Sequence, residues 1–349
     1  MAKLKLGFVG VGGMGQAAHL INYSQLWDDC EVVALTEIRP KLGKKVAAQY
    51  GIPGVYTDHR EMFAKEKLDG IVAIQQFLNH GALVPQLLEY GVPVITEKPL
   101  ASSLASGEKI LKAATSGKGT LYIGYHKRSD PASLYVKQQI AEWQKSGAMG
   151  KMTHVRVVMP PGDWISNGFF PVYGTDEQGP GLPNDVEGTN PDFAKKYDAF
   201  VNYYIHQINF LRYLLGESYT IDYVDRSGMI AAGNSASGVA FTLELGTYTT
   251  PKDWQEQSFV AFQKGWIKLD LPCPLTITQS GTVTVHEAPD NAQARTIMPT
   301  LPFIHAFRNQ AASFLKAIRG EKTQLCTPVD ALEDLRAARR YVEMLTGKK

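Results

Sequence analysis

Residues 3–19 read KLKLGFVGVGGMGQAAH, and this stretch decides the fold. Its glycines have the G-x-G-x-x-G spacing, directly after a run with strand character and directly before one with helical character. Such glycines allow a tight turn and a close approach of pyrophosphate, while the helix N-terminus supplies free N–H groups and a partial positive charge. We therefore predict a dinucleotide-binding turn, made by Gly10, Gly12, Gly13, Met14 and Gly15.

Beyond this turn, the first 125 residues alternate short β-rich runs with helical patterns. The strands are expected at residues 3–10, 30–37, 68–75, 92–97 and 120–125, and the helices at 14–26, 41–51, 82–91 and 104–117. All the strand runs except the second are nearly continuously apolar, as in a parallel sheet covered on both faces. The alternation predicts a doubly wound α/β domain of the Rossmann type.

The second strand run ends in an acid at the place that selects the cofactor. Glu37 lies 22 residues after Gly15, close to the spacing of a ribose-binding carboxylate. Such a carboxylate accepts bonds from the ribose hydroxyls and repels a 2′-phosphate, so Glu37 favours NAD. Arg39, two residues later, could instead accommodate the 2′-phosphate of NADP. The plainer alternatives are a glycine turn without a ligand and a surface glutamate.

The fourth strand run leads directly into Glu97, Lys98 and Pro99. Ligands of an open α/β sheet bind outside the carboxyl ends of its strands, and Pro99 keeps Lys98 out of helical geometry. We therefore expect Glu97 and Lys98 at the cofactor. Lys98 is the first catalytic candidate, because its charge can hold a substrate hydroxyl and favour loss of its proton. A solvated lysine is the alternative.

The character of the chain changes after Tyr125. A helix (132–147) and a strand (151–160) precede an irregular stretch rich in Gly, Pro, Asp and Asn, which contains the aromatic residues Trp164, Phe169, Phe170 and Tyr173. Later strands at 237–250, 256–271 and 275–287 predict an antiparallel sheet, and helices at 305–321 and 329–347 close the chain. We expect two domains, residues 1–126 for the cofactor and 127–349 for the substrate and oligomerisation. The last helices are candidates to pack back on the first domain.

Composition excludes several classes of function. The 349 residues carry a net charge of +2 and no basic cluster, which disfavours nucleic acid as a partner. No apolar run is long enough to span a bilayer. The lysine-flanked N-terminus is short, broken by glycine and without a cleavage site, so it reads as a strand and not as a signal peptide. Three widely spaced cysteines form no metal-ligand pattern and indicate a reduced, cytoplasmic setting.

A helix expected over residues 201–216 is apolar nearly all round but carries one polar row. At roughly 100° per residue, Asn202, His206, Asn209 and Tyr213 fall within about 60° of one another. Buried polar groups need partners, so this row faces a substrate, a crevice or a structural network. Spacing alone leaves a core histidine and a catalytic histidine equally open.

At this point the chain resembles the glucose–fructose oxidoreductase and inositol dehydrogenase (Gfo/Idh/MocA) family. The resemblance rests on GFVGVGGMGQAAH (7–19), EKP (97–99), GYHKRSDPAS (124–133) and the C-terminal run 307–338. Where most members carry Thr-Pro-Asn after the third strand run, this chain has Gln75, Gln76 and Phe77, although His80 still matches. The resemblance implies a Rossmann domain followed by an α/β domain with a large, open, mainly antiparallel sheet. That sheet commonly forms the oligomer interface, here of a homodimer or homotetramer.

The resemblance also implies a catalytic pair. Members commonly show an Asp, a His four residues later and a further Asp after three more, and this His works with the EKP lysine. His206 matches the histidine, while Asn202 and Asn209 stand where the acids are expected. An amide orients a ring by hydrogen bonding but cannot accept its proton. Asn202 is therefore expected to contact substrate, and Asn209 to make a structural bond.

Other side chains are candidates for the substrate pocket. Tyr125 ends the fifth strand run, and a tyrosine there or at Tyr203 is an alternative acid/base. Asp163 and Trp164 supply a carboxylate and an aromatic face suited to a sugar, or belong to a loop that packs on itself. The remaining candidates are Tyr204, His126 and Lys127.

The sequence thus predicts an NAD(P)-dependent oxidoreductase acting on a hydroxyl-bearing carbon of a sugar, polyol or glycoside, with Lys98 and His206 as catalytic residues and no metal. One alternative is a glycoside hydrolase that uses transient oxidation and elimination. Another is a non-catalytic dinucleotide sensor, which the loss of both acids around His206 favours.

Overall fold

The structure is a computed structural model that describes residues 2–159, 162–166, 168–169, 172–181, 185–246 and 253–347. The chain divides into two compact units, with residues 1–125, 167–194 and 307–335 in the first and residues 126–166, 195–306 and 336–349 in the second. The first boundary falls one residue before the predicted one. Residues 167–194, which the sequence assigned to the second domain, belong to the first unit. Phe170 lies outside the described residues.

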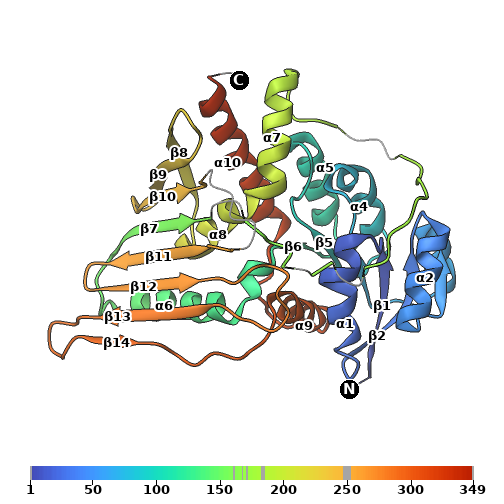
Figure 1. The fold of residues 1–349 in the computed structure, drawn as a ribbon, viewed down its shortest axis with the longest axis horizontal. Coiled ribbons are helices and arrows are strands. Elements are labelled where there is room, and N and C mark those ends of the chain that lie inside the picture. Colours follow the sequence, from blue (N-terminus) through green and yellow to red (C-terminus); the bar gives the residue numbers. More distant parts are fainter. Residues whose placement is uncertain are drawn as a thin grey trace. The chain divides into compact units, whose positions relative to one another are not determined.

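The first unit is built on six parallel strands in the order β3-β2-β1-β4-β5-β6 (Figure 1). The strands are β1 (Leu4–Val9), β2 (Cys30–Thr36), β3 (Gly54–Tyr56), β4 (Gly70–Ala73), β5 (Val94–Glu97) and β6 (Leu121–Gly124). Five of them match the predicted runs, whereas the three-residue β3 was not predicted. Strands β1 to β3 extend the sheet to one side, and β4 to β6 extend it to the other. The switch point between β1 and β4 is where α/β sheets bind ligands.

Helices with local start and stop signals connect these strands. They are η1 (Gly15–Leu20), α1 (Ile21–Ser24), α2 (Pro40–Tyr50), α3 (His59–Lys65), η2 (Phe77–Asn79), α4 (His80–Leu88) and α5 (Leu104–Thr115). Helix α9 (Ala306–Ile318) follows β14 in the chain and also packs in this unit. Helix α2 begins at a proline and ends at the left-handed Gly51 (φ 65°). Apolar side chains of α1, α2 and α9 form one core with β1 and β2, which explains how a C-terminal helix belongs to the first unit.

The second unit holds a mixed sheet in the order β14-β13-β12-β11-β7-β10-β9-β8. Its strands are β7 (Met152–Val158), β8 (Tyr219–Val224), β9 (Ile230–Ser235), β10 (Ala240–Glu244), β11 (Gln257–Phe262), β12 (Gly265–Asp270), β13 (Thr282–Glu287) and β14 (Arg295–Ile297). Only β7 and β10 pair in parallel. The helical elements are η3 (His126–Ser129), α6 (Pro131–Ser146), α7 (Pro191–Tyr203), α8 (Ile205–Leu215) and the end of α10 (Pro328–Thr346). The predicted fold class is confirmed.

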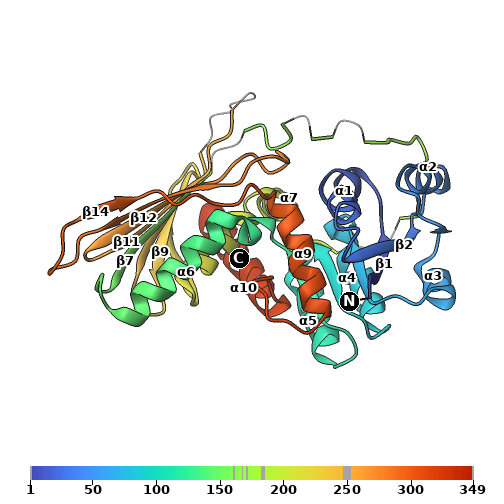
Figure 2. The ribbon, with the colours of Figure 1, turned by 90° about the horizontal axis from the view of Figure 1, so that it is seen from below.

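The two faces of this sheet differ. Alternate residues of β11, β12 and β13 are buried, and α6 packs on that face (Figure 2). The residues between them are half-buried or exposed, and they include a stacked row of Phe259, Trp266 and His286. This open face is what an antiparallel sheet presents to solvent or to a partner. In the described parts of the chain, no helix has the length and apolarity needed to cross a membrane.

Candidate functional site

The glycine turn between β1 and η1 is packed too closely for side chains. Gly10 has φ 92°, and a Cβ there would lie 2.3 Å from the carbonyl oxygen of Ile74. A Cβ on Gly15 would lie 2.8 Å from the carbonyl oxygen of Gly10. Gln75, which departs from the family pattern, donates from Nε2 to the carbonyl oxygen of Val9 at 2.5 Å and so secures the same turn.

The open side of the turn suits a dinucleotide. Among the described residues, a Cβ on Gly12 would meet the guanidinium of Arg39, at 3.4 Å, and one on Gly13 the ring of Phe169, at 3.6 Å. Both neighbours are ends of side chains, which yield to a ligand, so pyrophosphate can approach the backbone here. The side chain of Met14 packs against the core, which leaves its backbone as the group available to a cofactor.

Glu37 lies beside this turn at the end of β2. Its carboxylate is 3% exposed and accepts a bond from the backbone N–H of Val11 at 3.0 Å. Arg39 donates from Nε to Oε1 at 2.7 Å and from Nη2 to Oε2 at 3.1 Å. The structure thus brings the glycine turn, Glu37 and Arg39 together. A buried carboxylate in this place fits the ribose hydroxyls of a dinucleotide.

Lys98 follows β5 on a firmly held backbone. Its N–H donates to Oε2 of Glu97 at 3.1 Å, and Oε1 of Glu97 pairs with Nε2 of His19 at 2.7 Å. Both partners are nearly fully buried, and Phe307 packs edge-on against the His19 ring. The half-buried Lys98 therefore projects from a fixed point.

Two histidines that the sequence did not assign support this turn. His80 is fully buried, and its Nδ1 lies 3.1 Å from the carbonyl oxygen of Pro99 and 3.2 Å from that of Leu100. Burial lowers the pKa of His80, so the neutral ring donates to these carbonyls. His19 lies within the quoted fingerprint, in η1, but nothing in its spacing reveals that Glu97 is its partner.

The single helix expected over residues 201–216 is wrong, because the chain forms α7 and α8 with a break at Tyr204. Tyr204 has φ −86° and ψ −3°, and its hydroxyl donates to the carbonyl oxygen of Leu245 at 2.6 Å. Asn202 therefore lies in the last turn of α7 as an exposed residue, on a different helix from His206 and Asn209.

The polar residues of α8 have separate surroundings. Asn209 is buried and accepts a bond from Nε of Arg128 at 2.7 Å. The half-buried ring of His206 packs edge-on against that of His126, with 5.1 Å between ring centroids. His206 thus lies beside η3, in the second unit, whereas Lys98 belongs to the first.

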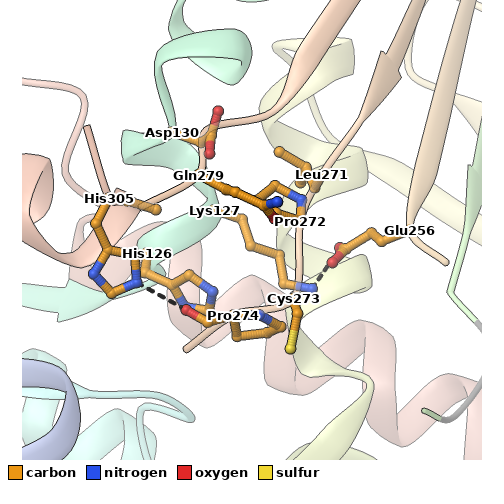
Figure 3. A pocket seen from close by; sticks show the side chains of 11 residues that line it. His126, Lys127, Asp130, Glu256, Leu271, Pro272, Cys273, Pro274, Gln279 and His305 are labelled. Carbon is orange, nitrogen blue, oxygen red and sulfur yellow. Dashed lines mark hydrogen bonds and ion pairs between the residues drawn. The ribbon is translucent and has the colours of Figure 1, made fainter. Parts of the chain in front are cut away.

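A pocket in the second unit lies next to these residues (Figure 3). His126 and Lys127 line it from η3, and Glu256 pairs with the ammonium of Lys127 although both side chains are almost fully buried. Burial lowers the pKa of Lys127, against the opposing charge of Glu256. Gln207 of α8 donates to the same carboxylate at 2.9 Å. The remaining lining residues are Asp130, Leu271, Pro272, Cys273, Pro274, Gln279, His305 and Ala306.

The other predicted substrate residues are buried or bonded to neighbouring loops. Tyr125 is 2% exposed and ends the first stretch of the first unit. The carboxylate of Asp163 accepts bonds from the N–H groups of Ile165 and Ser166, at 3.1 and 2.9 Å, and Trp164 is tied to Leu275 through its carbonyl oxygen. The bonds of the Asp163 carboxylate stay within its own loop, whereas the bond of Trp164 reaches the segment that precedes β13. Within the described residues, no group of three or more His, Cys, Asp or Glu is placed to hold a metal ion.

Asp130, at the pocket and at the start of α6, gives a pH-dependent prediction. Burial raises its pKa from 3.8 to about 6, against the bonds that it accepts from Ala132 and Gly281. The folded state binds the proton of Asp130 more tightly than the unfolded state does. The protonated carboxyl therefore contributes stability that is complete below pH 3.8 and is lost as the pH rises through 6. We expect the free energy of unfolding of Asp130→Asn, relative to that of wild type, to be about 2 kcal/mol higher at pH 7.5 than at pH 4. Urea titrations of both proteins at the two pH values measure this difference, and an equal difference at both would contradict it.

Comparison with known proteins agrees with this geometry. The family described as "Oxidoreductase family, NAD-binding Rossmann fold" matches residues 4–125. An inositol 2-dehydrogenase of Rubrobacter xylanophilus is 29% identical over 149 residues, which are 42% of this chain and 41% of that enzyme. The matched part spans 40–42% of the first three relatives, all of them inositol dehydrogenases.

Solved structures resemble the whole chain in fold. A putative NADPH-dependent oxidoreductase of Desulfitobacterium hafniense has a TM-score of 0.78 at 13% identity, covering 99% of this chain and 96% of that one. A levoglucosan dehydrogenase in complex with NADH and levoglucosan has a TM-score of 0.73 at 16% identity, covering 100% and 98%. Residues 4–125 thus match the NAD-binding Rossmann domain of the Gfo/Idh/MocA family of oxidoreductases.

Proposed function

We propose that the protein is an NAD-dependent dehydrogenase that oxidises a hydroxyl-bearing carbon of a sugar or polyol. The observation that carries this proposal is the dinucleotide turn with the buried carboxylate of Glu37 beside it and Lys98 at the end of β5. The inositol dehydrogenases among its relatives, and the levoglucosan dehydrogenase of like fold, support a carbohydrate substrate.

We assign separate roles to the chain's own groups. NAD, when bound, supplies the acceptor for hydride. The ammonium of Lys98 holds the substrate hydroxyl oxygen and favours its ionisation, while the His206 ring takes the released proton. Gly10, Gly12, Gly13, Met14 and Gly15 offer backbone to the pyrophosphate, and Glu37 binds the ribose. The pocket residues His126 and Lys127, together with Tyr203, are proposed substrate contacts.

The experiment that tests the proposal is a panel of sugars, inositols and nitrophenyl glycosides with NAD and NADP, followed at the absorbance of reduced nicotinamide. We expect NAD-dependent reduction with at least one sugar or polyol. Release of nitrophenol without net NADH would replace the dehydrogenase with the glycoside hydrolase. Binding of NADH without turnover of any compound would favour the sensor.

We also propose that the protein forms a homodimer or homotetramer through the open face of its large sheet. The stacked row of Phe259, Trp266 and His286 on that face offers apolar and aromatic area to a second copy. The molar mass measured by light scattering tests this assembly.

A further inference from the structure

A carboxylate from a remote part of the chain lies at the start of α2. The segment 172–181 runs past α2 (Figures 1 and 2), and Glu177 belongs to it. Oε2 of Glu177 accepts bonds from the backbone N–H groups of Lys41 at 2.9 Å and Leu42 at 3.3 Å. Thr175 donates to the same oxygen at 3.3 Å and accepts the N–H of Glu177 at 3.1 Å, which orients the carboxylate.

This position matters because of what precedes α2. The helix begins at Pro40, directly after Glu37 and Arg39 at the proposed ribose site. The N–H groups of its first turn and the positive end of its dipole form a backbone site for an anion next to the proposed ribose site. NADP differs from NAD by a phosphate on the 2′-oxygen of that ribose, so this phosphate would require the place where Glu177 is bonded.

The nearby arginine offers little compensation for that phosphate. Arg39 already makes two bonds to Glu37, at 2.7 and 3.1 Å. The pKa of Arg39 is raised, first by its hydrogen bond to Glu37 and also by the charge of Glu177. Two carboxylates therefore surround one guanidinium, and the local charge repels a phosphate.

We propose that Glu177 is a specificity-determining residue that excludes NADP by occupying the anion site at the N-terminus of α2. This inference rests on the proposed function, because it requires a dinucleotide at the glycine turn. Glu37 alone selects for the ribose hydroxyls. Glu177 adds a second barrier, which comes from the segment inserted after β7 and not from the β2 end that carries Glu37.

The test compares the dissociation constants of NADH and NADPH, measured by fluorescence titration of the full chain. In Glu177→Gln the amide oxygen still accepts the bonds from α2, but the negative charge is gone. We expect NADPH to bind about tenfold more tightly to this variant than to wild type, and NADH to change by less than about twofold. Glu177→Ala, which vacates the anion site, is expected to show at least the same gain.

Glu187→Gln is the matched control. Glu187 comes from the same inserted stretch and accepts a bond from the N–H of Leu104 at 2.7 Å, at the start of α5. Its carboxylate is bonded to a different helix, α5, so its loss is expected to leave the NADPH-to-NADH ratio unchanged. An equal shift in Glu187→Gln would mean general loosening and would overturn the role of Glu177.

The remaining outcomes separate this inference from the proposed function. If wild type binds NADH, and NADPH binding stays unchanged in both Glu177 variants, the inference is wrong and the dehydrogenase proposal stands. A wild type that prefers NADPH would also overturn it. If wild type binds neither dinucleotide, the proposed function fails and the inference fails with it.

Discussion

Replacing Lys98 by methionine is expected to lower kcat/KM for the sugar or polyol substrate by about 10³-fold. The substitution removes the ammonium that we propose holds the substrate oxygen, and it keeps most of the length of the side chain. Steady-state rates with NAD and the best compound of the panel measure the effect. Titration with NADH checks that the cofactor site survives.

In the structure, the backbone position of Lys98 does not depend on its ammonium group. The N–H of Lys98 is held by Glu97, and Glu97 by the buried His19, so the backbone stays fixed without the ammonium. Lys109→Met on α5 is the matched control, because it removes an exposed lysine of the same unit. Activity within about threefold of wild type in Lys98→Met would rule out the assigned role.

The first unit could be read from sequence because its signals are local. Short β-rich runs, four of them nearly continuously apolar, predicted five strands, and the glycine spacing placed the turn at Gly10. Strand β3 was missed because three residues, Gly54–Tyr56, are too few for a periodic signal. Helix α3, at His59–Lys65, is similarly short, although its cap at Asp58 is a recognisable start signal.

The site was predicted less completely because its partners come from distant segments. His19 meets Glu97, and Glu177 meets Lys41, across separations that no local pattern encodes. The break at Tyr204 was missed because apolar spacing continues through it. Helical-wheel reasoning therefore joined Asn202 to His206 although they lie on different helices.

Replacing His206 by asparagine is expected to lower kcat by about 10²- to 10³-fold and to remove the limb over which activity rises with pH. A base must be neutral to accept the substrate proton, so wild-type activity should fall as His206 becomes protonated. Asparagine retains a polar group beside His126 but cannot take a proton. The pH profiles of kcat for wild type and variant, with NADH affinity as the check on folding, measure this change.

Tyr203 is the rival base, and its surroundings argue against that role. Burial raises the pKa of Tyr203. The phenol therefore stays protonated at neutral pH and cannot accept the proton of a substrate hydroxyl. Tyr203→Phe is expected to lower kcat less than about tenfold and to keep the pH dependence of wild type. If Tyr203→Phe instead lost the activity that His206→Asn retained, the tyrosine would be the acid/base and His206 a binding group.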